Sequence, residues 1–406
     1  MNIVHLFTYN SYGNGGFSQR ICRQIKLFYQ INSVNFYGVH FLSFHKYLNM
    51  SLKKRIQNHK SKYINKNYIN LNIIYTIPRF RLFNSYCFYY WITSKLLYYK
   101  VKTMEIDLIY AENLKAGYIA YQFFLRYKIP YILDYHGVVP EEFKEFNLKH
   151  KAIEKEYRYL KKMEKTTIEN AKKIICVSHY FKNYLCMNFD LKSENIIVVP
   201  SCIDQQKIAF SNSMRFKYRE RLKLTDENVF IYNGSFTPYQ CIEKMILFFS
   251  ILLKFEKKIF FIFLVTSNLK DVEDLFKKYH VQNDKYTIKS VNHFEVVNYQ
   301  MAADFGLIIR DDSLVNRVAS PTKIFEYLST GLKLISTDNI GDIDILNIEK
   351  YVLSTNDINE DYIMENYINI LKKYDRNDNF NKCKIELMEK YIWDSYINDY
   401  ENIFKN

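Results

Sequence analysis

The stretch VASPTKIFEYLSTGLKLIS, residues 318–336, decides the fold. Pro321 suits the first position of a helix, Ser320 is a residue type that caps one, and Gly331 suits the point where a helix stops. Apolar residues at helical spacing lie between Pro321 and Gly331, and a short apolar run follows directly. The stretch therefore predicts a helix at 321–330 and a buried strand after it, as in an α/β protein.

The same alternation of apolar runs and helical patterns continues along the whole chain of 406 residues. Strand patterns fall at 2–7, 70–77, 106–110, 130–135, 173–178 and 195–200, and again at 229–234, 258–265, 285–290, 304–310 and 332–337. Helical patterns fall at 17–30, 83–103, 114–128, 151–170, 239–254, 270–280, 321–330 and 357–374. Continuous apolar strands that alternate with helices predict mostly parallel sheets covered on both faces.

The alternation restarts once, near residues 201–208, which indicates two domains. We expect a first Rossmann-like domain at 1–204 and a second at 205–390. Open parallel sheets bind ligands at the carboxyl ends of their strands, so a cleft between the two domains is the expected site.

Composition narrows the class of protein. Seven cysteines without a C-x-x-C pair are typical of reduced thiols in the cytosol rather than of disulfides or a zinc site. The start, MNIVHLF, lacks the pattern of a signal peptide, and the longest clean apolar run, at 259–265, is too short to cross a bilayer. Charge is uneven, because residues 1–104 contain fifteen Lys and Arg and no Asp or Glu, while the rest is nearly neutral.

Three glycines follow the first strand, in the stretch YNSYGNGGFSQR. Gly13, Gly15 and Gly16 would let the backbone approach a ligand and would leave amides at a helix start available to an anion or a sugar hydroxyl. The spacing is not G-x-G-x-x-G and no acidic residue lies about twenty positions on, which disfavours a dinucleotide site. A tight turn without a ligand is the alternative.

The stretch ILDYHGVVPEEF places Asp134, His136 and Gly137 at the carboxyl end of another strand. A histidine on this rim could orient a substrate hydroxyl or act as an acid or base near neutral pH. A histidine that only caps the strand end is the alternative.

Lys323 and Glu326 lie in the first two turns of the predicted helix at 321–330, and Arg310 ends the strand before it. A diphosphate at this helix start would meet free amides and the Lys323 charge, and the Glu326 carboxylate could accept hydrogen bonds from two ribose hydroxyls. A solvated Lys323–Glu326 pair is the alternative, although it leaves Arg310 unexplained.

These residues resemble a known family, the retaining glycosyltransferases of the GT-B fold in the family 4 group. SPTKIFEYLSTGLKLIS is similar to that group's segment P-x-K-x-x-E-Y-x-x-x-G-x-x-x-I. Weaker likenesses, in the expected order, are YGNGGFSQRI, LDYHG, VVPSCID at 198–204, YNGSF at 232–236 and WDSYINDYENIF at 393–404. The resemblance implies two Rossmann-like domains facing each other across a cleft, with a helix at 391–406 that crosses back to the first domain.

The resemblance also implies roles for individual residues. Glu326 would bind the nucleotide ribose, Lys323 would lie near the diphosphate, and His136 would approach the transferred sugar. The remaining contacts to the donor would come from Gly15, Gly16, Gly234, Ser320 and Thr322.

The chain departs from the family pattern at two places. The first of the family's two glutamates is Val318 here, and the arginine and lysine-glycine that follow the second-domain turn are replaced in GSFTPYQCIEKM, where Gln240 and Cys241 stand. Arg310 is therefore the substitute candidate for the phosphate partner, and we count it with His136 and Lys323 among the catalytic residues.

We expect a glycosyltransferase that moves a sugar from a nucleotide-diphosphate donor to a glycan or polyprenyl-diphosphate-linked acceptor in bacterial surface polysaccharide synthesis. It would need no cofactor beyond the donor co-substrate and no metal, since the only D-x-D, Asp342 and Asp344, is interpreted as helix capping. We expect a cytoplasmic protein, peripheral on the inner face of the membrane. A nucleotide-sugar epimerase or hydrolase, or a glycan phosphorylase, would be the enzyme alternative, and a basic nucleic-acid-binding protein, although no such signature occurs, the other.

Overall fold

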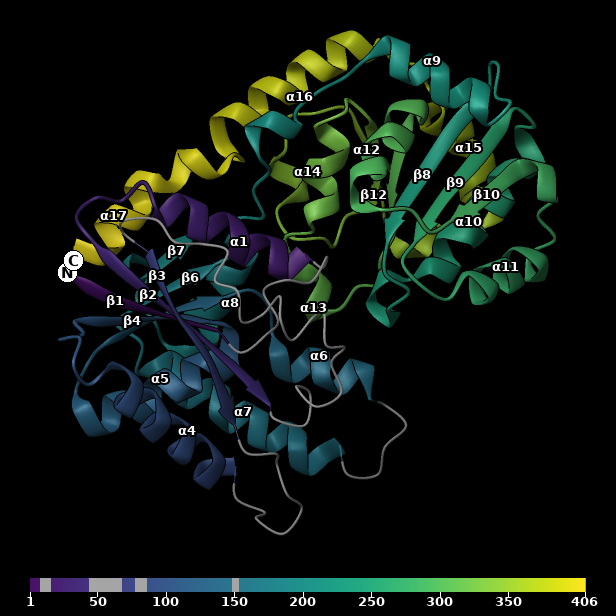
Figure 1. The fold of residues 1–406 in the computed structure, drawn as a ribbon. Helices are drawn as coiled ribbons and strands as arrows, with labels where there is room; N and C mark the ends of the chain where they lie inside the picture. The colour runs from purple at the N-terminus through teal and green to yellow at the C-terminus, as the bar shows by residue number, and fades with distance from the viewer. Residues whose placement is uncertain (8–15, 44–67, 77–85, 148–152, 406) are drawn as a thin grey trace. The chain divides into compact units, whose positions relative to one another are not determined.

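The computed structural model describes residues 1–7, 16–43, 68–76, 86–147 and 153–405. These form two compact units, the first made of Met1–Pro200 with Tyr396–Asn406 and the second of Ser201–Ser395 (Figure 1). Each unit contains one parallel sheet with helices on both faces, so the α/β fold class predicted from the sequence is confirmed. None of the described helices is both long and apolar enough to span a membrane.

The sheet of the first unit has seven strands in the order β3-β2-β1-β4-β5-β6-β7. Their bounds are β1 Asn2–Phe7, β2 Asn35–Ser43, β3 Tyr68–Thr76, β4 Leu108–Glu112, β5 Tyr131–Tyr135, β6 Lys173–Cys176 and β7 Ile196–Val198. The strand order reverses between β1 and β4, and in open parallel sheets such a switch point is where ligands bind.

Helices cover both faces of this first sheet. They are α1 Gly16–Phe28, α4 Tyr86–Val101, α5 Asn113–Tyr127, α6 Val139–Phe146, α7 Ile153–Glu169, α8 His179–Phe189 and α17 Ile397–Lys405. Helix α5 packs on β5 so closely that a Cβ at Gly117 would lie 2.6 Å from a methyl carbon of Leu133. Helix α17 returns to this unit from the end of the chain, because Phe404 packs against Phe28 and Phe36.

The sheet of the second unit has six strands in the order β10-β9-β8-β11-β12-β13. Their bounds are β8 Asn228–Gly234, β9 Ile259–Val265, β10 Tyr286–Lys289, β11 Phe305–Ile308, β12 Lys333–Thr337 and β13 Lys350–Leu353. The order reverses between β8 and β11, which places the switch point of this unit at the ends of those two strands.

Alternate residues of strands β8, β9, β11 and β12 enter two separate cores. One core joins the sheet to α10 Ile242–Phe255, α11 Leu269–Lys278 and α15 Glu360–Ile370. The other joins it to α9 Asn212–Arg221, α12 His293–Ala302, α14 Thr322–Leu328 and α16 Arg376–Lys390, and a four-residue helix, α13 Leu314–Arg317, precedes α14. Figure 1 shows these two sets of helices on opposite faces of the sheet.

The helix predicted at 321–330 forms, but it begins differently from the prediction. Helix α14 starts at Thr322 with Pro321 as its N-cap, and no side chain caps it. Ser320 instead joins the segment at Ser201, where its hydroxyl accepts from the Ser201 backbone N–H at 3.0 Å. The prediction that Ser320 caps the helix is wrong, since that hydroxyl already holds a distant part of the chain. Gly331 has the left-handed φ of 72° expected of a helix stop.

Candidate functional site

The candidate site in the second unit lies at the β8–β11 switch point. Asn233 and Gly234 end β8, Arg310 follows β11, and α14 supplies Lys323 and Glu326. A sixth residue is Gln240, which ends a short 3-10 turn after β8. The structure therefore gathers four of the sequence-predicted donor residues, Gly234, Arg310, Lys323 and Glu326, at one sheet edge.

Lys323 and Arg310 form a buried pair of cations that shares one neutral acceptor. The Lys323 ammonium donates to Gln240 Oε1 at 2.6 Å, and Arg310 Nη2 donates to the same oxygen at 3.1 Å. Both side chains are buried, with Lys323 8% and Arg310 3% exposed. Within the described part of the chain neither forms an ion pair with a carboxylate, and Arg310 Nε has no hydrogen-bond partner.

This arrangement is electrostatically unfavourable without a ligand. Burial, followed by the neighbouring Arg310 charge, lowers the pKa of Lys323 well below its usual value, and burial lowers the pKa of Arg310 as well. The Arg310 guanidinium lies 5.3 Å from the centre of the Tyr239 ring and the Lys323 ammonium 5.0 Å from that of Tyr232. Aromatic faces are weak partners for buried cations. An anion bound in this site would therefore be attracted by both positive charges.

Glu326 is held beside the cations by a chain of amides. Its Oε2 accepts from Asn233 Nδ2 at 3.0 Å, and Asn233 Oδ1 accepts in turn from Gln300 Nε2 at 3.1 Å. Gln300 and Asn233 are both buried, whereas Glu326 is only partly buried. The carboxylate is thus oriented by neutral groups, and part of its surface stays exposed.

Gly234 acts through the space it leaves. A Cβ at this position would lie 2.4 Å from Cε of Lys323, so any larger residue would displace the lysine side chain. The glycine predicted to contact the donor therefore positions a cation.

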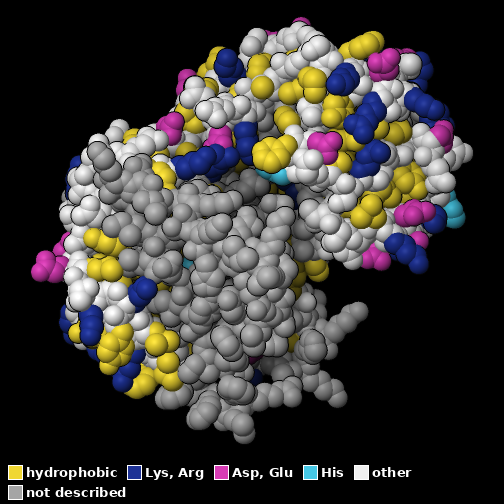
Figure 2. Space-filling view, in the orientation of Figure 1, with side chains coloured by type: hydrophobic (Ala, Val, Ile, Leu, Met, Phe, Trp, Pro, Cys, Tyr) yellow, Lys and Arg dark blue, Asp and Glu magenta, His cyan; other side chains and the backbone are white. Residues whose placement is uncertain are grey.

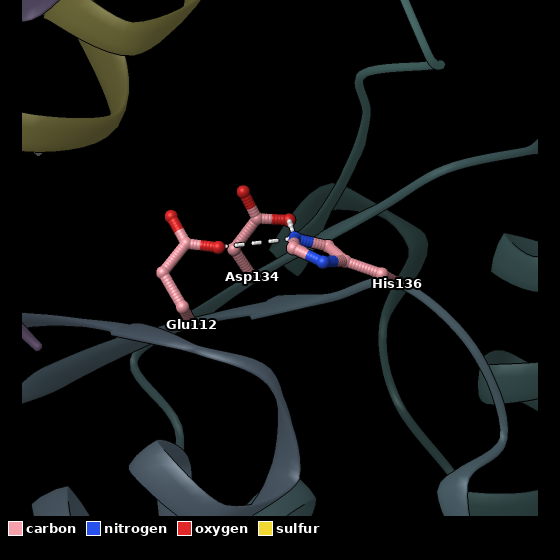
Figure 3. A group of neighbouring side chains, drawn as sticks. All are labelled: Glu112, Asp134 and His136. Carbon is pink, nitrogen blue, oxygen red and sulfur yellow. Dashed lines mark ion pairs between the residues drawn. The ribbon is translucent and has the colours of Figure 1, made fainter. Parts of the chain in front are cut away.

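Another buried polar cluster lies in the first unit. It is formed by Glu112 at the end of β4, Asp134 on β5 and His136 just after β5 (Figure 3). Nε2 of His136 lies 2.9 Å from Asp134 Oδ1 and 3.1 Å from Glu112 Oε2. The same nitrogen lies 3.2 Å from Nε of Arg20, a residue of α1. Two carboxylates face Nε2, and Arg20 has Asp134 and the Pro200 carbonyl as acceptors, so we assign the proton to Nε2.

Asp134 is the centre of this cluster. It is fully buried and accepts from Tyr110 and Gln24, both at 2.5 Å, in addition to Arg20 and His136. Burial alone would raise the pKa of Asp134, but the Arg20 and His136 charges outweigh it and the net shift is downward. Burial alone would lower the pKa of His136, but Asp134 outweighs it and that pKa is raised. His136 is therefore stabilised as a cation on this rim.

Glu112, Asp134 and His136 are also the one group within the described residues whose ligand atoms could surround a metal ion, lying within 4.8 Å of one another. Arg20 already places a positive charge on Asp134, and a second histidine, His5, contacts the other oxygen of Glu112 at 2.9 Å. Arg20 and His136 already place positive charge beside these two carboxylates, which fits a metal site poorly.

Several predicted residues stand elsewhere. Gly15 lies outside the described residues, and Gly16 is the first residue of α1. Thr322 is the first residue of α14 and is partly exposed beside Lys323. Asp342 precedes the short 3-10 turn Ile343–Ile345 but makes no side-chain capping hydrogen bond, so the capping interpretation of the D-x-D is wrong.

Four residues of the two clusters were not predicted as site residues: Glu112, Arg20, Asn233 and Gln240. Glu112 falls two residues beyond the strand predicted at 106–110. Extending that strand to its observed end at Glu112 would have placed this carboxylate at the same sheet edge as His136. Asn233 and Gln240 are neutral amides, whose role depends on which charged groups the fold brings beside them.

The chain thus consists of two α/β units, each with a switch point in its sheet, and the second unit carries a candidate anion site. Residues 60–207 match the family described as Glycosyltransferase Family 4. A search of curated protein sequences found no match.

Solved structures with this fold align over nearly the whole chain. A glycosyltransferase from Rickettsia africae is 14% identical, with a TM-score of 0.68, over 100% of this chain and 97% of that one. HepE from Anabaena, in complex with UDP and glucose, is 13% identical, with a TM-score of 0.68, over 99% of each chain. The lipopolysaccharide outer core galactosyltransferase WaaB is 12% identical, with a TM-score of 0.67, over 100% and 99%. The family match supports a glycosyltransferase, and these neighbours show the GT-B fold.

Proposed function

We propose that the protein transfers a sugar from a nucleoside-diphosphate donor to a glycan or lipid-linked acceptor in the synthesis of a bacterial surface polysaccharide, with retention at the sugar carbon. The observation that carries the proposal is the buried Lys323–Arg310 pair, which has no carboxylate partner within the described chain. A diphosphate supplies the missing negative charge, and UDP is the ligand named for the Anabaena neighbour.

In this proposal the second unit binds the donor. Arg310 and Lys323 hold the diphosphate and stabilise the charge that develops on it when its bond to the sugar breaks. Glu326, one turn further along α14, accepts hydrogen bonds from the ribose hydroxyls, and Asn233 fixes its orientation. His136, kept as a cation by Asp134, offers a hydrogen-bond donor to a sugar hydroxyl.

Calorimetry with UDP and uridine tests the donor site. Arg310→Ala and Lys323→Ala should each weaken UDP binding about tenfold to hundredfold, which is the value of a lost charge-assisted hydrogen bond to the diphosphate. Uridine lacks the diphosphate and therefore has no such bond to lose. Uridine binding should change by less than about threefold. Lys277→Ala, at an exposed position of α11, is the matched control and should affect neither ligand. Equal losses for UDP and uridine would show that Arg310 and Lys323 maintain structure instead.

We also propose that transfer needs no divalent metal. Arg310 and Lys323 would neutralise the leaving diphosphate. In the first unit, Arg20 already forms an ion pair with Asp134, one of the two carboxylates that could hold a metal ion. Screening nucleotide sugars for transfer or slow hydrolysis by mass spectrometry will supply an activity assay. That activity should persist in excess EDTA, and loss restored by Mg²⁺ or Mn²⁺ would refute the proposal.

A further inference from the structure

Gln240 accepts hydrogen bonds from both cations of the candidate site. It is 4% exposed, and its single Oε1 accepts from Lys323 at 2.6 Å and from Arg310 at 3.1 Å. It directly precedes a strained backbone position, because Cys241, the N-cap residue of α10, has a left-handed backbone with φ of 48°. The fold thus places an uncharged oxygen between two like charges.

We propose that Gln240 is a positioning residue that holds Lys323 and Arg310 side by side without neutralising them, so that their charge is available to a diphosphate. This inference rests on the proposed function of the same site and adds the residue that sets the charge of that site. A carboxylate at this position would hold the cations equally well but would neutralise part of their charge. An apolar residue would leave two buried donors without an acceptor.

The neutral acceptor has a consequence for protons. The charged and titratable groups around the Lys323 ammonium are Arg310 after β11, Tyr232 on β8 and Glu326 on α14, and Glu326 is bonded to Asn233. Burial and Arg310 disfavour the protonated lysine in the empty site, whereas a bound diphosphate favours it. Diphosphate binding therefore draws a proton into the site, and uridine binding does not.

Gln240→Glu separates this role from a merely structural one. The new carboxylate forms ion pairs with both cations, so the ligand-free protein should melt at a higher temperature than the wild type. UDP affinity should fall about tenfold to hundredfold while uridine affinity stays unchanged. Gln282→Glu makes the same charge change at an exposed position of the same unit and should alter neither property.

The proton is counted by calorimetry of UDP binding in two buffers of different ionisation enthalpy, at the same pH. Wild type should take up a proton with UDP and none with uridine, and Gln240→Glu should take up none, because Lys323 is already charged. Gln240→Met, which keeps the side-chain length, should lower UDP affinity without raising the melting temperature.

The outcomes separate the two proposals. If wild type binds UDP no better than uridine, the proposed function fails. If wild type prefers UDP but Gln240→Glu binds it equally tightly, or melts at an unchanged or lower temperature, the donor site stands and the role of Gln240 is refuted.

Discussion

At the scale of single residues, the chemistry of the candidate site in the second unit depends on which neutral groups surround its charged ones. Lys323 and Arg310 share an amide oxygen, and Glu326 is bonded to an amide nitrogen. Neutral partners orient a charged side chain without consuming its charge, which is what a site for an ionic ligand requires. By the same reasoning Glu326 has a different role from the cations, because its carboxylate has two oxygens that can accept hydrogen bonds.

Glu326→Ala should weaken the binding of uridine and UDP alike, by about tenfold to hundredfold, because both ligands carry the ribose that we assign to this carboxylate. Calorimetry with the two ligands measures the effect. Glu273→Ala, which removes an exposed carboxylate of α11, is the control. A folded Glu326→Ala protein with wild-type affinity for both ligands would exclude the ribose role.

The charged members of the candidate site could be placed together from sequence, because they lie at fixed steps from structural signals. Lys323 and Glu326 follow Pro321 within two turns, and Arg310 ends an apolar strand. Gln240 could not be identified in this way, because nothing in the stretch TPYQC shows that its amide will reach both cations. His136 was predicted, but its pairing with Glu112 depends on the parallel alignment of β4 and β5, which spacing along the chain does not give.

At the scale of elements, sequence patterns identified strands with continuous apolar runs. They missed elements whose apolar run is interrupted or that bury only a few positions. Strands β9 and β12 are almost wholly buried and were predicted within a residue of their ends. Among the elements that were missed are strand β2 and helices α9 and α16. β2 carries Gly38 and His40 within its apolar run, and α9 and α16 bury only a few positions each.

Helix α17 should stabilise the first unit. Phe404 is 1% exposed and packs on Phe28, Phe36 and Tyr110, while Tyr400 accepts a hydrogen bond from Gln24 at 3.0 Å. Phe404→Ala removes a buried ring and should lower the free energy of unfolding by about 3 kcal/mol, and Tyr400→Phe by about 1 kcal/mol.

Urea denaturation followed by circular dichroism measures both changes. Phe216→Ala is the matched control, because Phe216 on α9 is 72% exposed and its loss should cost little. If Phe404→Ala were no more destabilising than this control, α17 would not be an integral part of the first unit.

At the scale of the whole molecule, the alternation of strands and helices was enough to predict two parallel α/β units, since such sheets require helices on both faces. The charge distribution is a separate property. Fifteen Lys and Arg and no acids occur in residues 1–104, and the most basic segment, SLKKRIQNHKSK at 51–62, lies outside the described residues. Helix α4 is the largest described element of this region.

Helix α4 exposes aromatic and basic side chains together. Tyr99 is 66% exposed beside exposed Lys100, and the Lys95 ammonium lies 3.9 Å from the centre of the Trp91 ring. Figure 2 shows hydrophobic and basic side chains next to one another over this helix. Aromatic rings settle at the interface of a bilayer, and each basic residue near an anionic surface contributes about 1 kcal/mol, so we propose that α4 contacts an anionic membrane.

Sedimentation with liposomes tests this contact. Binding should increase with the fraction of anionic lipid and decrease with salt, because the attraction is screened. Lys100→Glu with Lys102→Glu should reduce affinity for anionic vesicles by more than about tenfold, since two attractive charges become repulsive. The same double reversal at Lys277 and Lys278, on α11 of the second unit, is the control and should leave binding unchanged. Binding that ignores both lipid charge and salt would indicate an enzyme whose acceptor is not presented at an anionic membrane.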